Sequence, residues 1–175
     1  MKKIVALLVA LVVIGGTVLP FVVGTMAEGQ IDNVVAHLDS SSPDYTVTLK
    51  EYKKGFLASE ALIELKLTNK SLVESIGEGQ EIVLPLDLFV AHGPILLDDG
   101  ISIGLFGYEV LLQDKHTGWI KEHIEAQGEG PFYSIHGSMN FLGLISLQDQ
   151  TLPFQLELDA LKVEVSAYQG QGNVV

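Results

Sequence analysis

Histidine is the residue type with the widest chemical scope in this chain, because cysteine is absent. The lack of cysteine excludes a thiolate zinc site, a cysteine nucleophile and a disulfide framework. A loop could bring His116 and His123 to one metal ion, but loop or surface histidines are the commoner outcome. We therefore expect no metal site and no cofactor. The five histidines are His37, His92, His116, His123 and His136.

A serine activated by a histidine is the one catalytic arrangement to consider, with Ser59 or Ser138 as the nucleophile and His92 or His136 as the base. Such a pair needs a hydrogen bond between the two side chains, and nothing in their spacing places them together. The nucleophile elbow, the phosphate-binding loop and the zincin motif are absent. We predict no catalytic residue, and a hydrolase with a histidine base remains the alternative. A serine oxygen within about 3.2 Å of a histidine nitrogen in a cleft would favour it.

The charge of the chain excludes another class of partner. The net charge is -12, and all ten positive charges are lysines because there is no arginine. A basic face for nucleic acid is therefore not expected, and the usual bidentate phosphate clamp is missing.

The N-terminal segment predicts a membrane anchor. Lys2 and Lys3 precede an uncharged run from residue 4 to residue 24. As a helix this run would be roughly 31 Å long, close to the thickness of about 30 Å of a bilayer core. The flanking lysines place the N-terminus in the cytoplasm and the body outside it. The alternative is a signal peptide cleaved after Ala27, but the apolar run is slightly long for one.

The anchor is followed by a predicted connector, residues 25–43. Apolar side chains recur at helical spacing from Thr25 to Leu38, and Thr25 with Glu28 fits a capping box. Pro43 ends the helix, because the residue before a proline resists helical geometry. The polar face of this helix has no lysine or arginine for headgroups, so we expect its apolar stripe to pack on the following domain.

Alternation with period two predicts a β-rich domain over residues 44–168 and a flexible tail over 169–175. Two alternating runs on either side of Gly55 form a predicted antiparallel hairpin. A third run covers Tyr133–Phe141. A fourth covers Phe154–Val165, and its change of phase at Ala160–Leu161 predicts a β-bulge or a strand end. Short helices are expected near residues 72–76 and 118–127.

Two middle strands are apolar on both faces, Ile82–Val90 and Ile101–Leu112, and such strands need cover on both sides. Pro85 cannot donate to a ladder, which predicts an edge or a bulge. Gly104 and Gly107 permit sharp curvature of the second strand. The predicted fold class is mainly β (α+β): a transmembrane helix, a curved antiparallel sheet and one or two short helices.

Two short segments resemble a known family. Residues 52–61, with Gly55 between Tyr52 and Phe56, resemble a stretch near the start of bacterial YdgA-like proteins, and residues 91–95 resemble their His-Gly-Pro segment. The resemblance covers most of residues 1–165, although those proteins are usually much longer. It implies an inner-membrane segment, a periplasmic body and an unknown function. It carries no catalytic residues over.

These observations predict an inner-membrane-anchored periplasmic protein without enzymatic activity. Its partners are the inner membrane, through residues 4–24, and a lipid-like ligand or an envelope protein on an apolar sheet face. His92, at a strand end, is a weak candidate for binding, and we expect its removal to cost about 1 kcal/mol. If both faces of the middle strands are ordinary core, no such ligand face exists.

Overall fold

The computed structural model describes the backbone of residues 2–76, 81–96, 102–112, 122–158 and 161–174. The side chains at positions 2–17, 19, 72, 75, 76, 126, 158, 161 and 174 lie outside the described part.

One long helix, α1 (Lys2–Ser41), precedes all the described strands. At about 1.5 Å per residue its 40 residues extend roughly 60 Å. Ile31 and Val35, four residues apart, bury the same face of the helix against the sheet. The helix ends at Ser41, two residues before Pro43, as predicted.

The predicted start of a separate helix at Thr25 is wrong, because α1 is continuous through residue 25. The Thr25 hydroxyl does not cap a helix start. It donates to the Phe21 carbonyl oxygen one turn earlier, at 3.0 Å. The capping-box pattern therefore has no effect on the chain here, since the same helix continues on both sides of it. The prediction that the connector packs on the domain is confirmed by the buried Ile31 and Val35.

No helix within the described residues is both long and apolar enough to cross a membrane. The predicted anchor, residues 4–24, falls largely on positions whose side chains lie outside that part of the chain.

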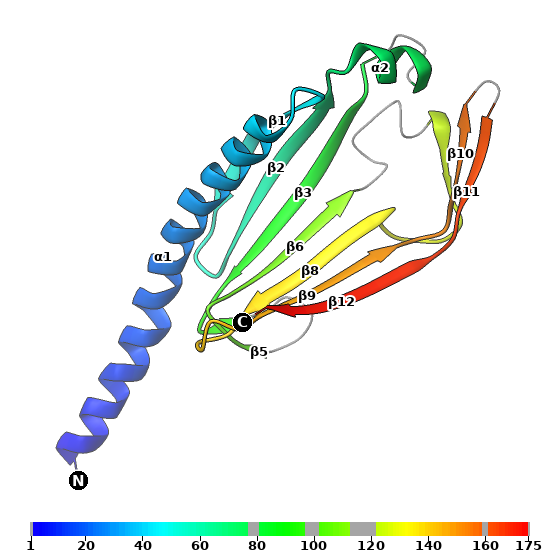
Figure 1. Ribbon diagram of the computed structural model, residues 1–175. Helices are drawn as coiled ribbons and strands as arrows, with labels where there is room; N and C mark the ends of the chain where they lie inside the picture. Colours follow the sequence, from blue (N-terminus) through cyan, green and yellow to red (C-terminus); the bar gives the residue numbers. More distant parts are fainter. Residues whose placement is uncertain (1, 77–80, 97–101, 113–121, 159–160, 175) are drawn as a thin grey trace.

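The fold is mainly β, as predicted, and is built on a seven-stranded antiparallel sheet in the order β1-β2-β3-β6-β8-β9-β12. The sheet is strongly curved, and α1 lies along its β1 side (Figure 1). Its strands are β1 (Tyr45–Lys54), β2 (Ala58–Leu67), β3 (Val83–His92), β6 (Phe106–Leu112), β8 (Tyr133–Met139), β9 (Ile145–Thr151) and β12 (Tyr168–Val174).

Two smaller sheets and a short helix complete the described structure. A three-stranded sheet has the order β11 (Leu161–Val165), β10 (Phe154–Leu158) and β7 (Ile124–Ala126). A two-stranded sheet pairs β4 (Ile95–Leu96) with β5 (Ser102–Ile103). The expected helix near residues 72–76 is α2 (Lys70–Ile76).

The core lies between α1 and the near half of the sheet. Side chains of α1 pack on β1, β2 and β3, whose alternating residues point towards the helix. The buried members of this helix–sheet core are Ile31, Val35, Val47, Ala61, Leu88 and Val90.

Three predicted elements need correction. The expected helix at 118–127 is present only in part: residues 122–123 are helical, residues 124–126 form β7, and 118–121 lie outside the described residues. The change of phase at Ala160–Leu161 marks a strand end rather than a bulge, because β10 ends at Leu158 and β11 begins at Leu161, and these two residues face each other. The strand predicted from residue 101 divides into β5 and β6 around Gly104.

The C-terminal tail is also corrected, because residues 168–174 form β12, paired with β9 along its whole length. Pro85 lies in an interior strand rather than at an edge. Glu64 of β2 faces it, but the pairing between β3 and β6 begins only at Leu86. Within the described residues the β3–β6 pairing stops at Leu86 and Leu112, one residue short of the proline.

Candidate functional site

The two family-like segments, far apart in sequence, meet at one end of the sheet. Ala58 of β2 faces Ala91 of β3, and the His92 amide donates to the Leu57 carbonyl oxygen at 2.7 Å. The β1–β2 turn and the end of β3 therefore form a single structure. Antiparallel pairing dictates this meeting, because the turn that begins β2 must lie beside the end of β3.

His92 is an interior side chain, with none of its surface exposed. Its imidazole Nδ1 lies 3.3 Å from the Phe56 carbonyl oxygen. If Nδ1 carries the proton and donates, Nε2 is left as an acceptor, and it has no partner. The prediction of an accessible strand-end histidine that binds a ligand is therefore not supported by its position.

Helix α1 closes over His92 at Gly24. A methyl group placed on Gly24 would lie 2.6 Å from His92 Cε1 and 2.9 Å from Nδ1. Only glycine lets the helix backbone approach the imidazole ring this closely. The sequence signal was present, as a glycine at the end of an apolar run, but nothing in the sequence names the histidine as its neighbour.

Burial lowers the pKa of His92 below its ordinary value of 6.5. Desolvation is the larger cause, and the positive charge of Lys54 acts in the same direction. The hydrogen bond to the Phe56 carbonyl opposes both by favouring the charged form. A neutral imidazole under the helix is the consequence.

Two side chains of β1, Tyr52 and Lys54, contact the same segment of α1. Lys54 Nζ donates to Thr25 Oγ1 at 2.8 Å, pairs with Glu28 Oε2 at 3.4 Å and lies 5.1 Å from the centre of the Phe21 ring. The Tyr52 hydroxyl lies 3.4 Å from the Gly24 carbonyl oxygen. We call this contact region the helix clamp: Tyr52, Lys54 and His92 of the sheet with residues 21–28 of α1.

The serine–histidine pairs considered for catalysis do not form. The Ser59 hydroxyl is buried without a partner, and so is His92 Nε2, so these two groups do not bond to each other. Ser138 Oγ bonds instead to Ser146 Oγ at 2.9 Å. The His136 imidazole lies 3.5 Å from a carboxylate oxygen of Glu109.

That His136–Glu109 pair lies in a polar groove on the side of the sheet away from α1. Serine, glutamine and asparagine side chains of β8, β9 and β12 line the groove with it. Among the described residues, no group of three or more histidine, aspartate or glutamate side chains could hold a metal ion. Of the two histidines considered for a metal, His116 lies outside the described residues and His123 is half-buried beside β7.

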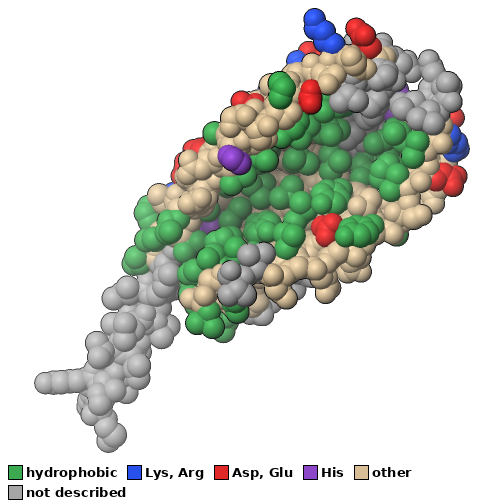
Figure 2. Space-filling model, in the orientation of Figure 1, with side chains coloured by type: hydrophobic (Ala, Val, Ile, Leu, Met, Phe, Trp, Pro, Cys, Tyr) green, Lys and Arg blue, Asp and Glu red, His purple; other side chains and the backbone are tan. Residues whose placement is uncertain are grey.

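The face of the sheet that packs on α1 continues beyond the helix as an apolar surface. Strand pairing puts Leu86, Leu112 and Tyr133 in one row across β3, β6 and β8, with Ile135, Met139 and Leu147 on the same face. These side chains are half-buried or exposed, in contrast to the fully buried Leu88 and Val90. Figure 2 shows apolar side chains gathered over this hollowed face. We call the six residues the open apolar face.

A polar cluster borders the open apolar face. Asp149 and Tyr168 point to the same face of β9 and β12, and their oxygen atoms both lie against Gly170. Burial raises the pKa of the nearby Tyr133 above its ordinary value, and Asp149 and Tyr168 raise it further. This cluster offers hydroxyl groups and one carboxylate beside an otherwise apolar surface. The sequence analysis missed it because β9 and β12 were not predicted as strands.

Comparison with known proteins supplies a family without an activity. Residues 1–175 match a family model described as "Bacterial protein of unknown function (DUF945)". The expectation of an uncharacterised bacterial family is thereby confirmed, while the YdgA-like name itself is not tested. Neither the curated proteins nor the solved structures contain a match.

Proposed function

The chain belongs to this bacterial family of unknown function, and we propose that it is a membrane-tethered binding module of the cell envelope, whose open apolar face holds a lipid-like ligand. The observation that carries the proposal is the open apolar face itself. Its side chains are contiguous and half-buried or exposed, and they continue the surface on which α1 packs. Apolar surface of this extent, when it is not core, usually marks a binding site.

The tether is proposed from the sequence. The apolar run at residues 4–24 has the length of a membrane span and follows two lysines, which favours a cytoplasmic N-terminus and a body in the periplasm. Without Lys2 and Lys3, eight lysines stand against twenty-two acidic residues. Anionic headgroups would repel such a body, so an anchor is needed to keep it at the membrane.

The chemistry of the face favours a ligand with an acyl chain and a polar end that is neutral or cationic. Leucine, isoleucine and methionine side chains offer no hydrogen bonds and suit a hydrocarbon chain. The cluster of Tyr133, Asp149 and Tyr168 offers hydroxyl groups and a negative charge to the polar end. A hydrolase is not favoured, because neither Ser59 nor Ser138 contacts a histidine base.

The test uses the full chain in vesicles that contain phosphatidylcholine with a photoreactive diazirine in its acyl chain. After illumination, mass spectrometry locates the modified residues. We expect adducts on β6, β8 and β9. The variant Ile135→Asn should reduce them several-fold, whereas His136→Asn, which changes the next residue on the opposite face, should not.

Adducts confined to residues 4–24 would contradict the binding role, because those residues would meet lipid only as an anchor. If β6, β8 and β9 carry no lipid adducts at all, the face does not hold an acyl chain, and the proposal is wrong.

A further inference from the structure

Large apolar side chains are exposed on three turns of the sheet, and these turns do not belong to the open apolar face. One turn joins β1 to β2, one includes β4 and β5, and one joins β8 to β9. Leu142 is 86% exposed and Ile103 is 74% exposed, values unusual for leucine and isoleucine outside an interface. We call these side chains the apolar rim: Phe56, Leu57, Ile95, Ile103, Phe141, Leu142 and Leu144.

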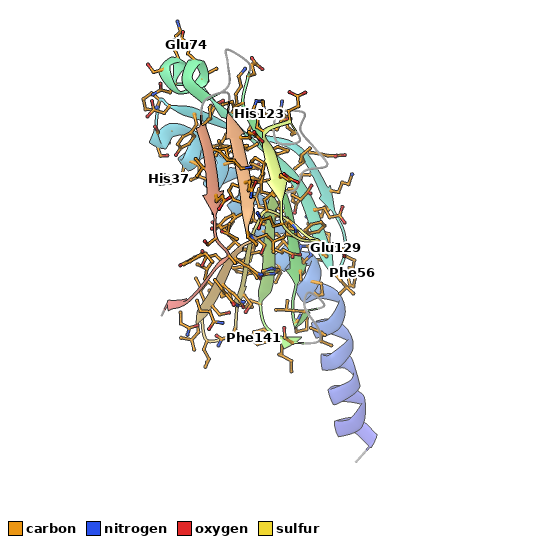
Figure 3. All side chains as sticks on the ribbon, turned by 90° about the vertical axis from the view of Figure 1, so that its right-hand side faces the viewer. His37, Phe56, Glu74, His123, Glu129 and Phe141 are labelled. Carbon is orange, nitrogen blue, oxygen red and sulfur yellow. The ribbon has the colours of Figure 1, made fainter. Side chains whose placement is uncertain are left out.

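The three turns lie at the same end of the sheet. In Figure 1 the β1–β2 and β8–β9 turns and β5 lie at the end where α1 extends past the sheet, and α2 lies at the opposite end. Figure 3 shows Phe56 and Phe141 towards the end where the helix projects, and Glu74 of α2 at the far end. Strand direction explains this, because β1, β3 and β8 all end here and each is antiparallel to the strand that follows it in the sheet.

Backbone hydrogen bonds connect two of these turns to each other. The Gly93 amide donates to the Leu105 carbonyl oxygen at 2.7 Å, and the Leu105 amide donates to the Met139 carbonyl oxygen at 2.8 Å. The ends of β3 and β8 and the turn before β6 are therefore tied together. At Gly93 the backbone of residues 104–105 is too close to leave room for a side chain.

Charge is missing from the rim in a chain that carries twenty-two acidic residues. The described parts of the turns, residues 55–58, 93–96, 102–107 and 139–147, contain no charged side chain. The two aspartates of the middle turn, Asp98 and Asp99, fall in residues 97–101, outside the described part. The described charges that flank the first turn are Lys53 and Lys54 on β1 and Glu60 on β2, which faces Lys53.

The rim also lies where the apolar run of α1 ends. Gly24, the last residue of that run, packs against His92, three residues before the rim residue Ile95. Phe21 and Val22 of α1 are exposed at the same level. From residue 4 to residue 20 the helix is long enough, at about 1.5 Å per residue, to cross most of a bilayer core of about 30 Å.

We propose that the apolar rim enters the surface of the bilayer from which α1 emerges, so that the sheet stands upright on the membrane. This proposal rests on the proposed anchoring of α1. The described parts of the turns are uncharged and expose phenylalanine, leucine and isoleucine, which bind a bilayer by burying apolar area, without anionic lipid. The open apolar face then begins at the membrane surface, and an acyl chain reaches it directly from the bilayer.

The absence of cysteine allows a direct test, because any introduced cysteine is the only one in the chain. The full-length variants Ile103→Cys and Leu142→Cys are labelled with the environment-sensitive dye NBD and placed in phosphatidylcholine vesicles. The control at the far end is Glu74→Cys, whose side chain is exposed. Val9→Cys, within the apolar run, reports on the anchor. Thermal unfolding of each labelled variant verifies its fold.

We expect at least a twofold loss of NBD fluorescence at positions 103 and 142 when the acyl chains carry bromine, and no loss at position 74. If position 9 is quenched while 103 and 142 behave like 74, the anchor holds and the rim proposal is wrong. If no position is quenched and the chain does not float with the vesicles, both proposals fail. A blue shift without bromine quenching would show burial between two copies of the chain and would also overturn the rim proposal.

Discussion

At the scale of single residues, His92 is the centre of the helix clamp. Its imidazole has no exposed surface, lies directly against Gly24 of α1 and is hydrogen-bonded to the Phe56 carbonyl oxygen. The sequence alone predicts that removal of His92 lowers the free energy of unfolding by about 1 kcal/mol, as for a half-exposed residue at a strand end. This value is too small for a fully buried ring. Truncation of a buried ring of this size leaves a cavity and an orphaned carbonyl, at a cost of about 3 kcal/mol.

The lowered pKa of His92 makes the stability of the protein depend on pH. In the unfolded chain the imidazole takes up a proton near pH 6.5, whereas the folded protein resists protonation until a lower pH. Between these two values the unfolded state binds more protons, so the free energy of unfolding falls as pH falls. The slope contributed by one such group is at most about 1.4 kcal/mol per pH unit.

We therefore expect urea unfolding of the wild type to give a lower free energy at pH 5.5 than at pH 7.5, and His92→Gln to lose part of this dependence. His92→Gln should be less stable than the wild type at pH 7.5, and the gap should narrow on acidification. His37→Gln, a substitution on the exposed surface of α1, is the matched control. An unchanged pH profile in His92→Gln would show that another group causes the acid sensitivity.

At the scale of elements, the docking of α1 on the sheet depends on a glycine in the middle of a helix. Glycine costs a helix interior about 1 kcal/mol relative to alanine, so each helical glycine needs a reason. At Gly24 the reason is the His92 ring, which leaves no room for a side chain. At Gly29 there is no such reason, because a methyl group there would meet nothing within 4 Å. The two positions lie five residues apart in the same helix and form a natural pair.

Gly24→Ala should destabilise the protein, because the new methyl group displaces the helix from the His92 ring, at a cost of about 1–3 kcal/mol. Gly29→Ala should instead stabilise it, by up to about 1 kcal/mol. Thermal unfolding of both variants measures the difference in sign. If Gly24→Ala and Gly29→Ala stabilised the protein equally, α1 would not contact the sheet at Gly24.

The same elements show how far the sequence could be read. Alternation predicts β1, β2 and β8 well, because one face of each is covered by apolar neighbours and the other is polar. Alternation does not reveal β9 and β12. On the face away from α1 these strands carry polar residues that include Gln148, Gln150 and Gln171, and on the face towards α1 β12 carries two glycines. Their pairing comes from backbone hydrogen bonds, which leave no pattern in side-chain polarity.

The site was less predictable than the fold. His92 and the turn at Gly55 stand out in the sequence, but their meeting with α1 depends on contacts between residues 26 or more positions apart. The open apolar face depends on strand order. Only the pairing of β3 with β6 and of β6 with β8 places Leu86, Leu112 and Tyr133 side by side.

At the scale of the whole molecule, one curved sheet presents a single apolar surface that serves two purposes. Its near half forms the core with α1, and its far half remains open (Figure 2). The opposite side of the sheet carries the polar groove around His136 and Glu109. A helix laid along one side of a curved sheet covers only part of it, so the division between core and open face follows from the size of the helix.

Leu88 and Leu86 test this division, because they lie two residues apart on the same face of β3. Leu88 is 8% exposed and belongs to the helix–sheet core, whereas Leu86 is half-buried on the open apolar face. Leu88→Asp should prevent stable folding, because an unpaired buried charge costs several kcal/mol. At Leu86 the new carboxylate remains in contact with water, so Leu86→Asp should cost much less.

The decisive measurement combines thermal unfolding with the photoreactive lipid for the same two variants. Leu86→Asp should retain a cooperative transition close to that of the wild type, yet its lipid adducts on β6 and β8 should fall several-fold. An acyl chain bound beside Leu112 would have to displace water from the new carboxylate, which is unfavourable. Leu88→Ala, a milder core change, should lower stability by about 3 kcal/mol and leave the adducts of the folded fraction in place. If Leu86→Asp unfolds the protein as Leu88→Asp does, the far half of the surface is core, and the ligand must bind elsewhere.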